Sequence, residues 1–145
     1  VAFNPYLPGS LFKEEIIRLE NKLKSGIVTS IWIQFGTNCE LLESRIHILK
    51  DIIASSQKHN SRISNVTLFG SILIPSRQFL ARFRYRPWKG VYCSTDFLES
   101  VDIANNYVSR LLKTYQKYKI SPIIETNTST EEKLKSLSFI LNYKG

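Results

Sequence analysis

The sequence predicts an α/β protein in which parallel β-strands alternate with amphipathic helices. Apolar runs rich in β-branched and aromatic residues occur near positions 1–3, 30–35, 66–74 and 120–124. Between them, apolar residues recur every three or four positions, the period of a helix lying on a sheet. Such alternation is typical of βα units around a parallel sheet. We count four units in one domain of 145 residues, which is either a small open sheet or half of an eight-unit barrel.

The first helix is expected from about Ser10 to Ser25. Ser10 has the hydroxyl that an N-cap needs, and Gly26 is placed to end the helix. The apolar stripe of this helix consists of Phe12, Ile16, Leu19 and Leu23.

The next strand, Ser30–Phe35, is apolar along nearly all of its length, so we expect it to be buried on both faces. Its exception is Gln34 at the carboxyl end, where ligands meet parallel sheets and barrels. The amide either binds a ligand or satisfies backbone groups of the following loop.

Four further helices complete the expected pattern. Thr37 and Glu40 have the spacing of a capping box for the second helix. A short helix is expected around Arg77–Phe83, after the third strand. The remaining apolar stripes are Leu42, Ile46, Leu49 and Ile53 in the second helix, Ala104, Val108, Leu111 and Tyr115 before the last strand, and Leu134, Leu137 and Leu141 after Ser129.

Composition narrows the classes of function. The net charge of +8 suggests an anionic partner. No apolar run is long enough to span a bilayer, and the two cysteines form no CxxC pair. We therefore expect no membrane span, no metal site and an intracellular location, in the cytoplasm or an organelle matrix. The chain starts at Val1 and has no methionine, so we expect a processed product or a piece of a longer protein.

The sequence contains no recognisable catalytic motif. Walker, GxGxxG and Gly-x-Ser-x-Gly patterns are all missing, and no nucleophile stands out. His47 adjoins the core stripe of the second helix and is expected to be packed. His59 falls in a polar stretch and is expected to be exposed. We therefore assign no catalytic residue.

A basic segment follows the third strand. Guanidinium groups bind phosphates, aromatic rings stack on bases or flavins, and both are common in protein–protein hot spots. The alternative is a solvated turn whose arginines pair with nearby carboxylates. The candidate contacts to an anion or partner are Arg77, Arg82, Arg84, Arg86, Trp88 and Lys89.

The order of several short motifs resembles the methylenetetrahydrofolate reductases, which are flavin-dependent eight-fold βα barrels. The likeness covers nearly the whole chain, but only strands five to eight of that barrel. It therefore implies the C-terminal half of a TIM-type barrel. The motifs are Val1-Ala2-x-Asn4-Pro5, Glu15-x-x-x-Leu19-x-x-Lys22-x-x-x-Gly26, Ser30-x-x-x-Gln34, Gly70-Ser71-Ile72-Leu73-Ile74-Pro75-Ser76-Arg77, Asp102-Ile103-Ala104 and Pro122-Ile123-Ile124-Glu125-Thr126-Asn127.

The resemblance implies a role for three residues. Glu15 stands where the family has an acidic residue that holds the ribityl chain of FAD, and Lys22 where it has a lysine near the flavin phosphates. Gln34 stands where a glutamine hydrogen-bonds the pterin of the folate. Without the resemblance, Glu15 and Lys22 would form a helix-surface ion-pair stripe with Arg18.

The sequence also departs from the family's pattern. Ile33 replaces the usual threonine, and Arg77 aligns with the aromatic clamp that the family often carries after its seventh strand. The catalytic acid belongs to the first half of the barrel, which this chain lacks. Two functions follow. Completed by an N-terminal half or partner subunit, the chain is expected to reduce methylenetetrahydrofolate with a nicotinamide nucleotide. Alternatively, it is a non-catalytic accessory subunit docked by its basic segment to a large anionic assembly.

Overall fold

The computed structural model describes residues 1–61, 63, 65–126, 130, 131 and 135. The helix expected after Ser129, with Leu134, Leu137 and Leu141, falls on residues outside this set. The elements in chain order are β1 (Ala2–Phe3), α1 (Gly9–Lys24), β2 (Ser30–Ile33), α2 (Cys39–His59), β3 (Thr67–Leu73), α3 (Arg77–Tyr85), the 3-10 helix η1 (Asp96–Leu98), α4 (Val101–Tyr118) and β4 (Ser121–Glu125).

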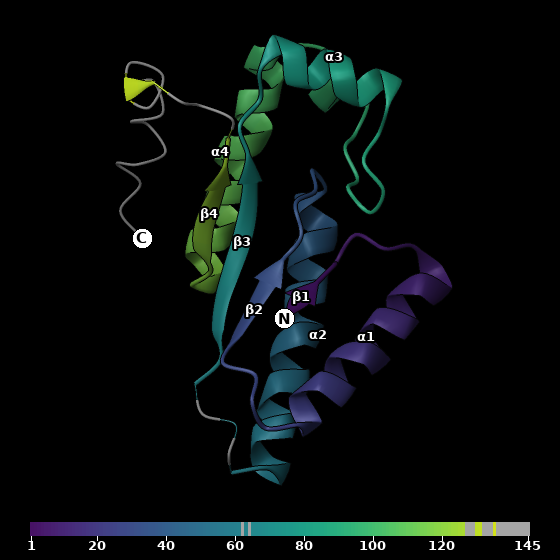
Figure 1. The fold of residues 1–145 in the computed structure, drawn as a ribbon, viewed down its shortest axis with the longest axis vertical. Coiled ribbons are helices and arrows are strands. Elements are labelled where there is room, and N and C mark those ends of the chain that lie inside the picture. Colours follow the sequence, from purple (N-terminus) through teal and green to yellow (C-terminus); the bar gives the residue numbers. More distant parts are fainter. Residues whose placement is uncertain (62, 64, 127–129, 132–134, 136–145) are drawn as a thin grey trace.

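The strands form one parallel sheet in the order β1-β2-β3-β4, as the alternation of strands and helices predicted. The helices α2 and α4 run along the sheet, α1 packs beside α2, and α3 lies beyond the end at which the strands finish (Figure 1). The carboxyl ends of all four strands therefore point toward α3, which makes this end of the sheet the place to look for a site.

The core lies between the sheet and the helices. Ile31, Ile33 and Ile72 are fully buried on the helix-facing side of the strands. The predicted stripes face them, with Leu19, Leu23, Leu42, Ile46, Leu49, Ala104, Val108, Leu111 and Tyr115 all buried. At Gly70 the sheet and α4 come so close that a Cβ atom would lie 2.3 Å from the ring of Tyr115. Glycine is therefore needed at this position of β3.

The expectation that the Ser30–Phe35 strand is buried on both faces was wrong. Ile31 and Ile33 are buried, but Trp32, which points to the opposite side, is 44 % exposed. Helices cover one face of the sheet, and the other, which we call the open face, has no such cover in the described residues. By register and alternation, the open face includes Ala2, Trp32, Gln34, Phe69, Ser71, Ile123 and Glu125.

Two helix caps differ from those predicted. Pro8 occupies the N-cap position of α1, so Ser10 lies inside the first turn. Asn38, rather than Thr37, caps α2, because its Oδ1 accepts from the Leu41 N–H at 2.8 Å. The Thr37 hydroxyl instead accepts from the backbone N–H of Ser94 at 2.8 Å. Gly26 ends α1 as predicted, with a φ of 73° that suits glycine.

Candidate functional site

The long loop 86–95 after α3 crosses the carboxyl ends of β1 and β2. The Asn4 side-chain N–H donates to the Gly90 carbonyl at 2.8 Å, and the Thr37 N–H donates to the Tyr92 carbonyl at 3.1 Å. A single parallel bridge joins Gly36 to Tyr92. These contacts, made between residues far apart in the sequence, build a rim around the strand ends.

A hollow of about 330 Å³, lined by both apolar and polar groups, opens on the open face near these strand ends. Most of its polar groups come from the carboxyl ends of the strands, as expected for a ligand site in a parallel sheet. The residues that line it are Ala2, Phe3, Asn4, Glu15, Trp32, Gln34, Ser71 and Glu125.

Gln34 lies in this hollow, immediately after β2. Its Oε1 accepts from the N–H of Phe35 at 2.8 Å, so half of the amide satisfies the following loop. The Nε2 group has no hydrogen-bond acceptor among the described residues, and it is therefore a donor available to a ligand. The structure thus shows the loop-capping alternative for the oxygen of this amide, and ligand binding by its nitrogen stays a prediction.

Trp32 and Ser71 form the floor of the hollow. The indole Nε1–H donates to the Ser71 hydroxyl at 2.5 Å, while the Tyr115 hydroxyl donates to the Ser71 carbonyl at 3.1 Å. Sequence reasoning gave neither Trp32 nor Ser71 a role. The sequence signal that could have located Ser71 was the period-two alternation along β3, which sets Ser71 on the face opposite Gly70 and Ile72.

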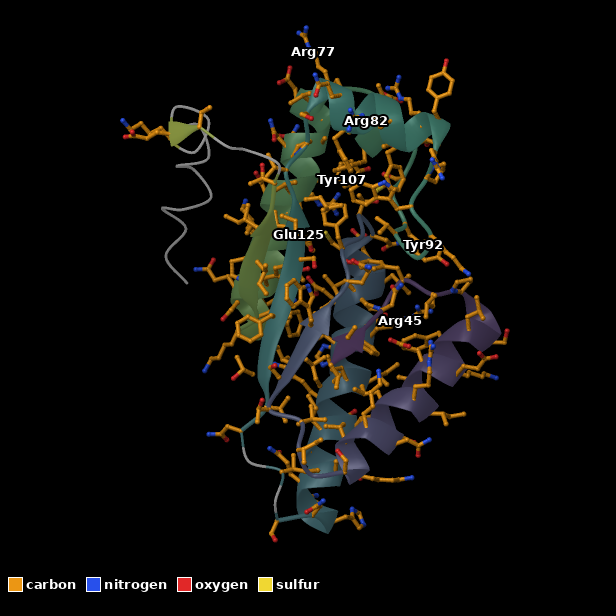
Figure 2. The ribbon with its side chains drawn as sticks, viewed as in Figure 1. Arg45, Arg77, Arg82, Tyr92, Tyr107 and Glu125 are labelled. Atoms are coloured by element: carbon orange, nitrogen blue, oxygen red, sulfur yellow. The ribbon has the colours of Figure 1, made fainter. Side chains whose placement is uncertain are left out.

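Glu125 ends β4 and is also missing from the residues assigned from the sequence (Figure 2). It is exposed, and it takes part in no ion pair in the part of the chain that the structure describes. Glu125 lines this hollow and also a second one, described below, between α3 and the ends of β3 and β4. It is therefore the carboxylate best placed to accept hydrogen bonds from a ligand.

A second hollow of about 400 Å³ lies between α3 and the ends of β3 and β4. Its wall is aromatic: Phe79, Phe83 and Trp88 pack on one another with ring centroids 5.6–6.1 Å apart. Arg82 and Glu125 add opposite charges to the lining.

Glu15 and Lys22 do not share one pocket. Glu15 is buried; its Oε1 accepts from the Asn4 N–H at 2.8 Å and its Oε2 from Arg18 at 2.7 Å. Lys22 is exposed about two turns further along α1, toward the loop that enters β2. The ion pair between Glu15 and Arg18 matches part of the stripe expected without the family resemblance.

Arg45 is a further anchor that sequence reasoning missed. Its guanidinium donates to the carbonyls of Pro5 and Leu7 and lies 3.7 Å from the centre of the Phe12 ring. Partial burial lowers the pKa of this group, which still leaves it charged at neutral pH. Arg45 therefore holds the loop after β1 against α2 (Figure 2).

All six residues of the basic segment are exposed, and two of them also make contacts within the protein. Arg84 donates to the carbonyls of Leu98 and Glu99, and Trp88, half exposed, packs on Phe79 and Phe83. The other members, Arg77, Arg82, Arg86 and Lys89, are exposed. Among the described residues, none of these four forms an ion pair.

His47 and the two cysteines do not line the two hollows, and the described residues hold no metal centre. His47 is exposed rather than packed in the core; its Nε2 lies 3.2 Å from the Tyr118 hydroxyl, away from both hollows. Burial raises the pKa of Cys39 and raises that of Cys93 to about 12, so both thiols stay protonated at neutral pH. No group of three or more His, Cys, Asp or Glu side chains gathers as metal ligands in the described ranges.

Comparisons with protein-family models, curated proteins and solved structures give no match for this chain. Among the described residues, no helix is both long enough and apolar enough to span a membrane.

Proposed function

We propose that this chain is the C-terminal half of a methylenetetrahydrofolate reductase-like barrel, and that its open face supplies the wall that binds the folate. The observation that carries the proposal is the position of Gln34. This residue lines a hollow at the carboxyl end of a four-stranded parallel sheet in sequential order, with one face uncovered. The motif match noted in the sequence assigns the same residue to the pterin.

The chemistry of the hollow suits a pterin. A pterin edge presents a carbonyl acceptor beside N–H donors. The free Nε2–H of Gln34 can donate to the carbonyl, and the carboxylate of Glu125 can accept from the N–H groups. Trp32 offers an indole face within the same hollow. These residues bind and orient a substrate, and none of them is proposed to transfer a proton.

FAD fits this chain alone poorly. Both carboxylate oxygens of Glu15 already accept hydrogen bonds, and Lys22 lies toward the opposite end of α1. The cofactor roles of Glu15 and Lys22 stay predictions. We assign flavin and nicotinamide-nucleotide binding to the barrel completed by the missing half, where the family's catalytic acid would also lie.

Folate binding can be followed by tryptophan fluorescence, because Trp32 lies in the hollow. The Trp88→Phe variant is expressed in the native host, purified with any associated chain and titrated with 5-methyltetrahydrofolate. We expect saturable quenching. Gln34→Ala and Glu125→Gln should each weaken binding by about tenfold, the effect of one or two hydrogen bonds. Glu14→Gln, an exposed carboxylate on the outer side of α1, should change nothing.

Two outcomes would contradict the proposal. If Gln34→Ala lowers the melting temperature and leaves folate affinity unchanged, the amide is a structural cap for the loop at Phe35. If the native preparation shows neither quenching nor flavin absorption bands, the reductase-like function fails as a whole.

A further inference from the structure

The outer side of α3 is an exposed cationic surface with an aromatic residue in it. Leu80 and Phe83 are buried against the body of the protein. Residues on the other side of the helix stay in solvent, and Tyr85 is 95 % exposed. We define the α3 surface as Arg77, Arg82, Tyr85, Arg86 and Lys89, all of them exposed. Figure 2 shows Arg77 and Arg82 at the end of the molecule beyond the strands.

We propose that the α3 surface binds single-stranded nucleic acid, with its cations on phosphates and Tyr85 stacked on a base. This inference uses no residue that lines the folate hollow; Arg82 lines the second hollow, which shares Glu125 with it.

The position of the α3 surface is fixed by contacts between α3 and its neighbouring residues. The Ser76 hydroxyl caps α3 by accepting from the Phe79 N–H at 3.1 Å, and Arg84 ties the last turn to the carbonyls of Leu98 and Glu99. Trp88 packs edge-on against Phe79 and Phe83. A preformed platform loses little conformational entropy when it binds a ligand.

The positive charges of the α3 surface are not neutralised by the nearby carboxylates. Glu99 and Asp102 line a groove beside Arg77, and Glu125 shares the second hollow with Arg82. None of these carboxylates pairs with the α3 surface among the described residues, where the ion pairs involve Glu15, Glu40, Glu43 and Glu131. The part of the surface around Tyr85, Arg86 and Lys89 has no acidic residue in its sequence neighbourhood. With a net charge of +8, the protein should attract polyanions over a distance.

Tyr85 favours nucleic acid over an acidic protein. Carboxylate side chains would satisfy the guanidinium groups but would leave the tyrosine ring without a partner. Bases stack on an exposed aromatic ring whatever their sequence, and guanidinium groups bind phosphates in bidentate geometry. At about 13 Å, α3 is long enough to follow only a few nucleotides. Because stacking requires bases that are free of their complement, the proposed ligand is single-stranded.

The test is fluorescence anisotropy of a labelled 20-nucleotide oligouridylate, titrated with the full chain at several salt concentrations. We expect binding that weakens steeply with salt. The variant Arg82→Glu/Arg86→Glu should lose at least tenfold in affinity, and its log–log salt slope should fall by about 1.4 for two lost phosphate contacts. Tyr85→Ala should lose about fivefold, since it removes one stacked base.

A matched control separates this surface from general charge. Lys13→Glu/Lys58→Glu makes the same change in net charge on the exposed sides of α1 and α2, and should lower affinity by less than about twofold at moderate salt. Circular dichroism checks that each variant is folded. Equal losses in control and test variants would overturn the proposal, as would no binding at low salt.

Competition identifies the class of partner. A duplex of the same length and poly-glutamate should compete more weakly than the oligouridylate. Poly-glutamate that competed equally well would make the surface a docking site for acidic proteins and would overturn the assignment. Folate quenching, measured in the native preparation with the Trp88→Phe background, should be unchanged by Tyr85→Ala or Arg86→Glu, so the two proposals fail separately.

Discussion

Glu15 shows how one buried carboxylate can join two elements. It lies on α1, accepts from the Asn4 N–H after β1, and is neutralised by Arg18. The Asn4 side chain in turn donates to the Gly90 carbonyl, and its Oδ1 accepts from the N–H of Tyr6 at 3.0 Å. The Glu15 carboxylate thus helps to fix the backbone at the carboxyl end of β1.

Replacing Glu15 by alanine should destabilise the protein. The Asn4 N–H would lose its acceptor in a partly buried position, which costs about 1–3 kcal/mol. Glu15→Gln keeps an acceptor oxygen and should lose less, because the pair with a mostly exposed Arg18 contributes little. Urea unfolding of both variants measures the difference. An unchanged free energy of unfolding in Glu15→Ala would contradict this structural role.

At the scale of elements, α2 and α4 are joined by a polar cluster centred on Glu43. Its carboxylate accepts from Lys117 at 2.8 Å, Tyr118 at 3.3 Å and Thr114 at 3.5 Å. The hydrogen bond from Lys117 is the main cause that holds the pKa of Glu43 below its ordinary value.

The contribution of Glu43 to stability should depend on pH. A carboxylate with a lowered pKa in the folded state stabilises the protein above its unfolded pKa, and this stabilisation is lost as the pH falls through the folded value. Glu43→Gln should therefore lower the melting temperature at pH 7 by a few degrees at most, on the order expected for a partly exposed pair. The gap to the wild type should close well below pH 4.5, the ordinary pKa.

Glu40→Gln serves as the control for this series. Glu40 has one exposed ion pair, with Arg110 at 2.6 Å, so its loss should matter less. A gap between wild type and Glu43→Gln that widened in acid would contradict the prediction.

The elements were predictable from the sequence where local pattern decides them. The stripe at Leu42, Ile46 and Leu49 is buried as predicted, because a helical period on a sheet admits one arrangement. The caps were less predictable. Thr37 has the same capping chemistry as Asn38, and the N–H of Ser94, 57 residues away, engages its hydroxyl. A contact of that sequence separation leaves no trace in a local pattern.

The site was predictable only in part, for a similar reason. Gln34 could be found because a lone amide ends an apolar strand. Glu125 and Ser71 could not, because their meeting in one hollow depends on the register of β3 and β4. Likewise, the sequence groups Arg84 with Arg82 and Arg86, but Arg84, while exposed, donates to the carbonyls of Leu98 and Glu99.

At the scale of the whole molecule, the open face of the sheet is the main apolar surface without a cover among the described residues. Trp32 is 44 % exposed there, with Phe69 and Ile123 half-buried beside it. β1 and β4 are edge strands among the described elements, and each presents backbone groups that a further strand can pair with. A face of this kind is stable in water when another surface covers it.

We expect the isolated 145-residue chain to self-associate through this face. Sedimentation velocity should show a size that grows with protein concentration, and the exposed indole should become less accessible to acrylamide as it does so. Phe69→Lys/Ile123→Lys places two charges on the open face and should shift the protein toward monomer, because each lysine would have to be desolvated in the contact. Ile27→Lys is the matched control, since Ile27 is 81 % exposed in the loop before β2, at the other end of the sheet.

If the wild type stayed monomeric at every concentration, the open face would need no cover, and the case for a completing half would lose its physical basis. If Ile27→Lys abolished association as well as the double variant does, the contact would lie at the loop end of the sheet and not on its open face.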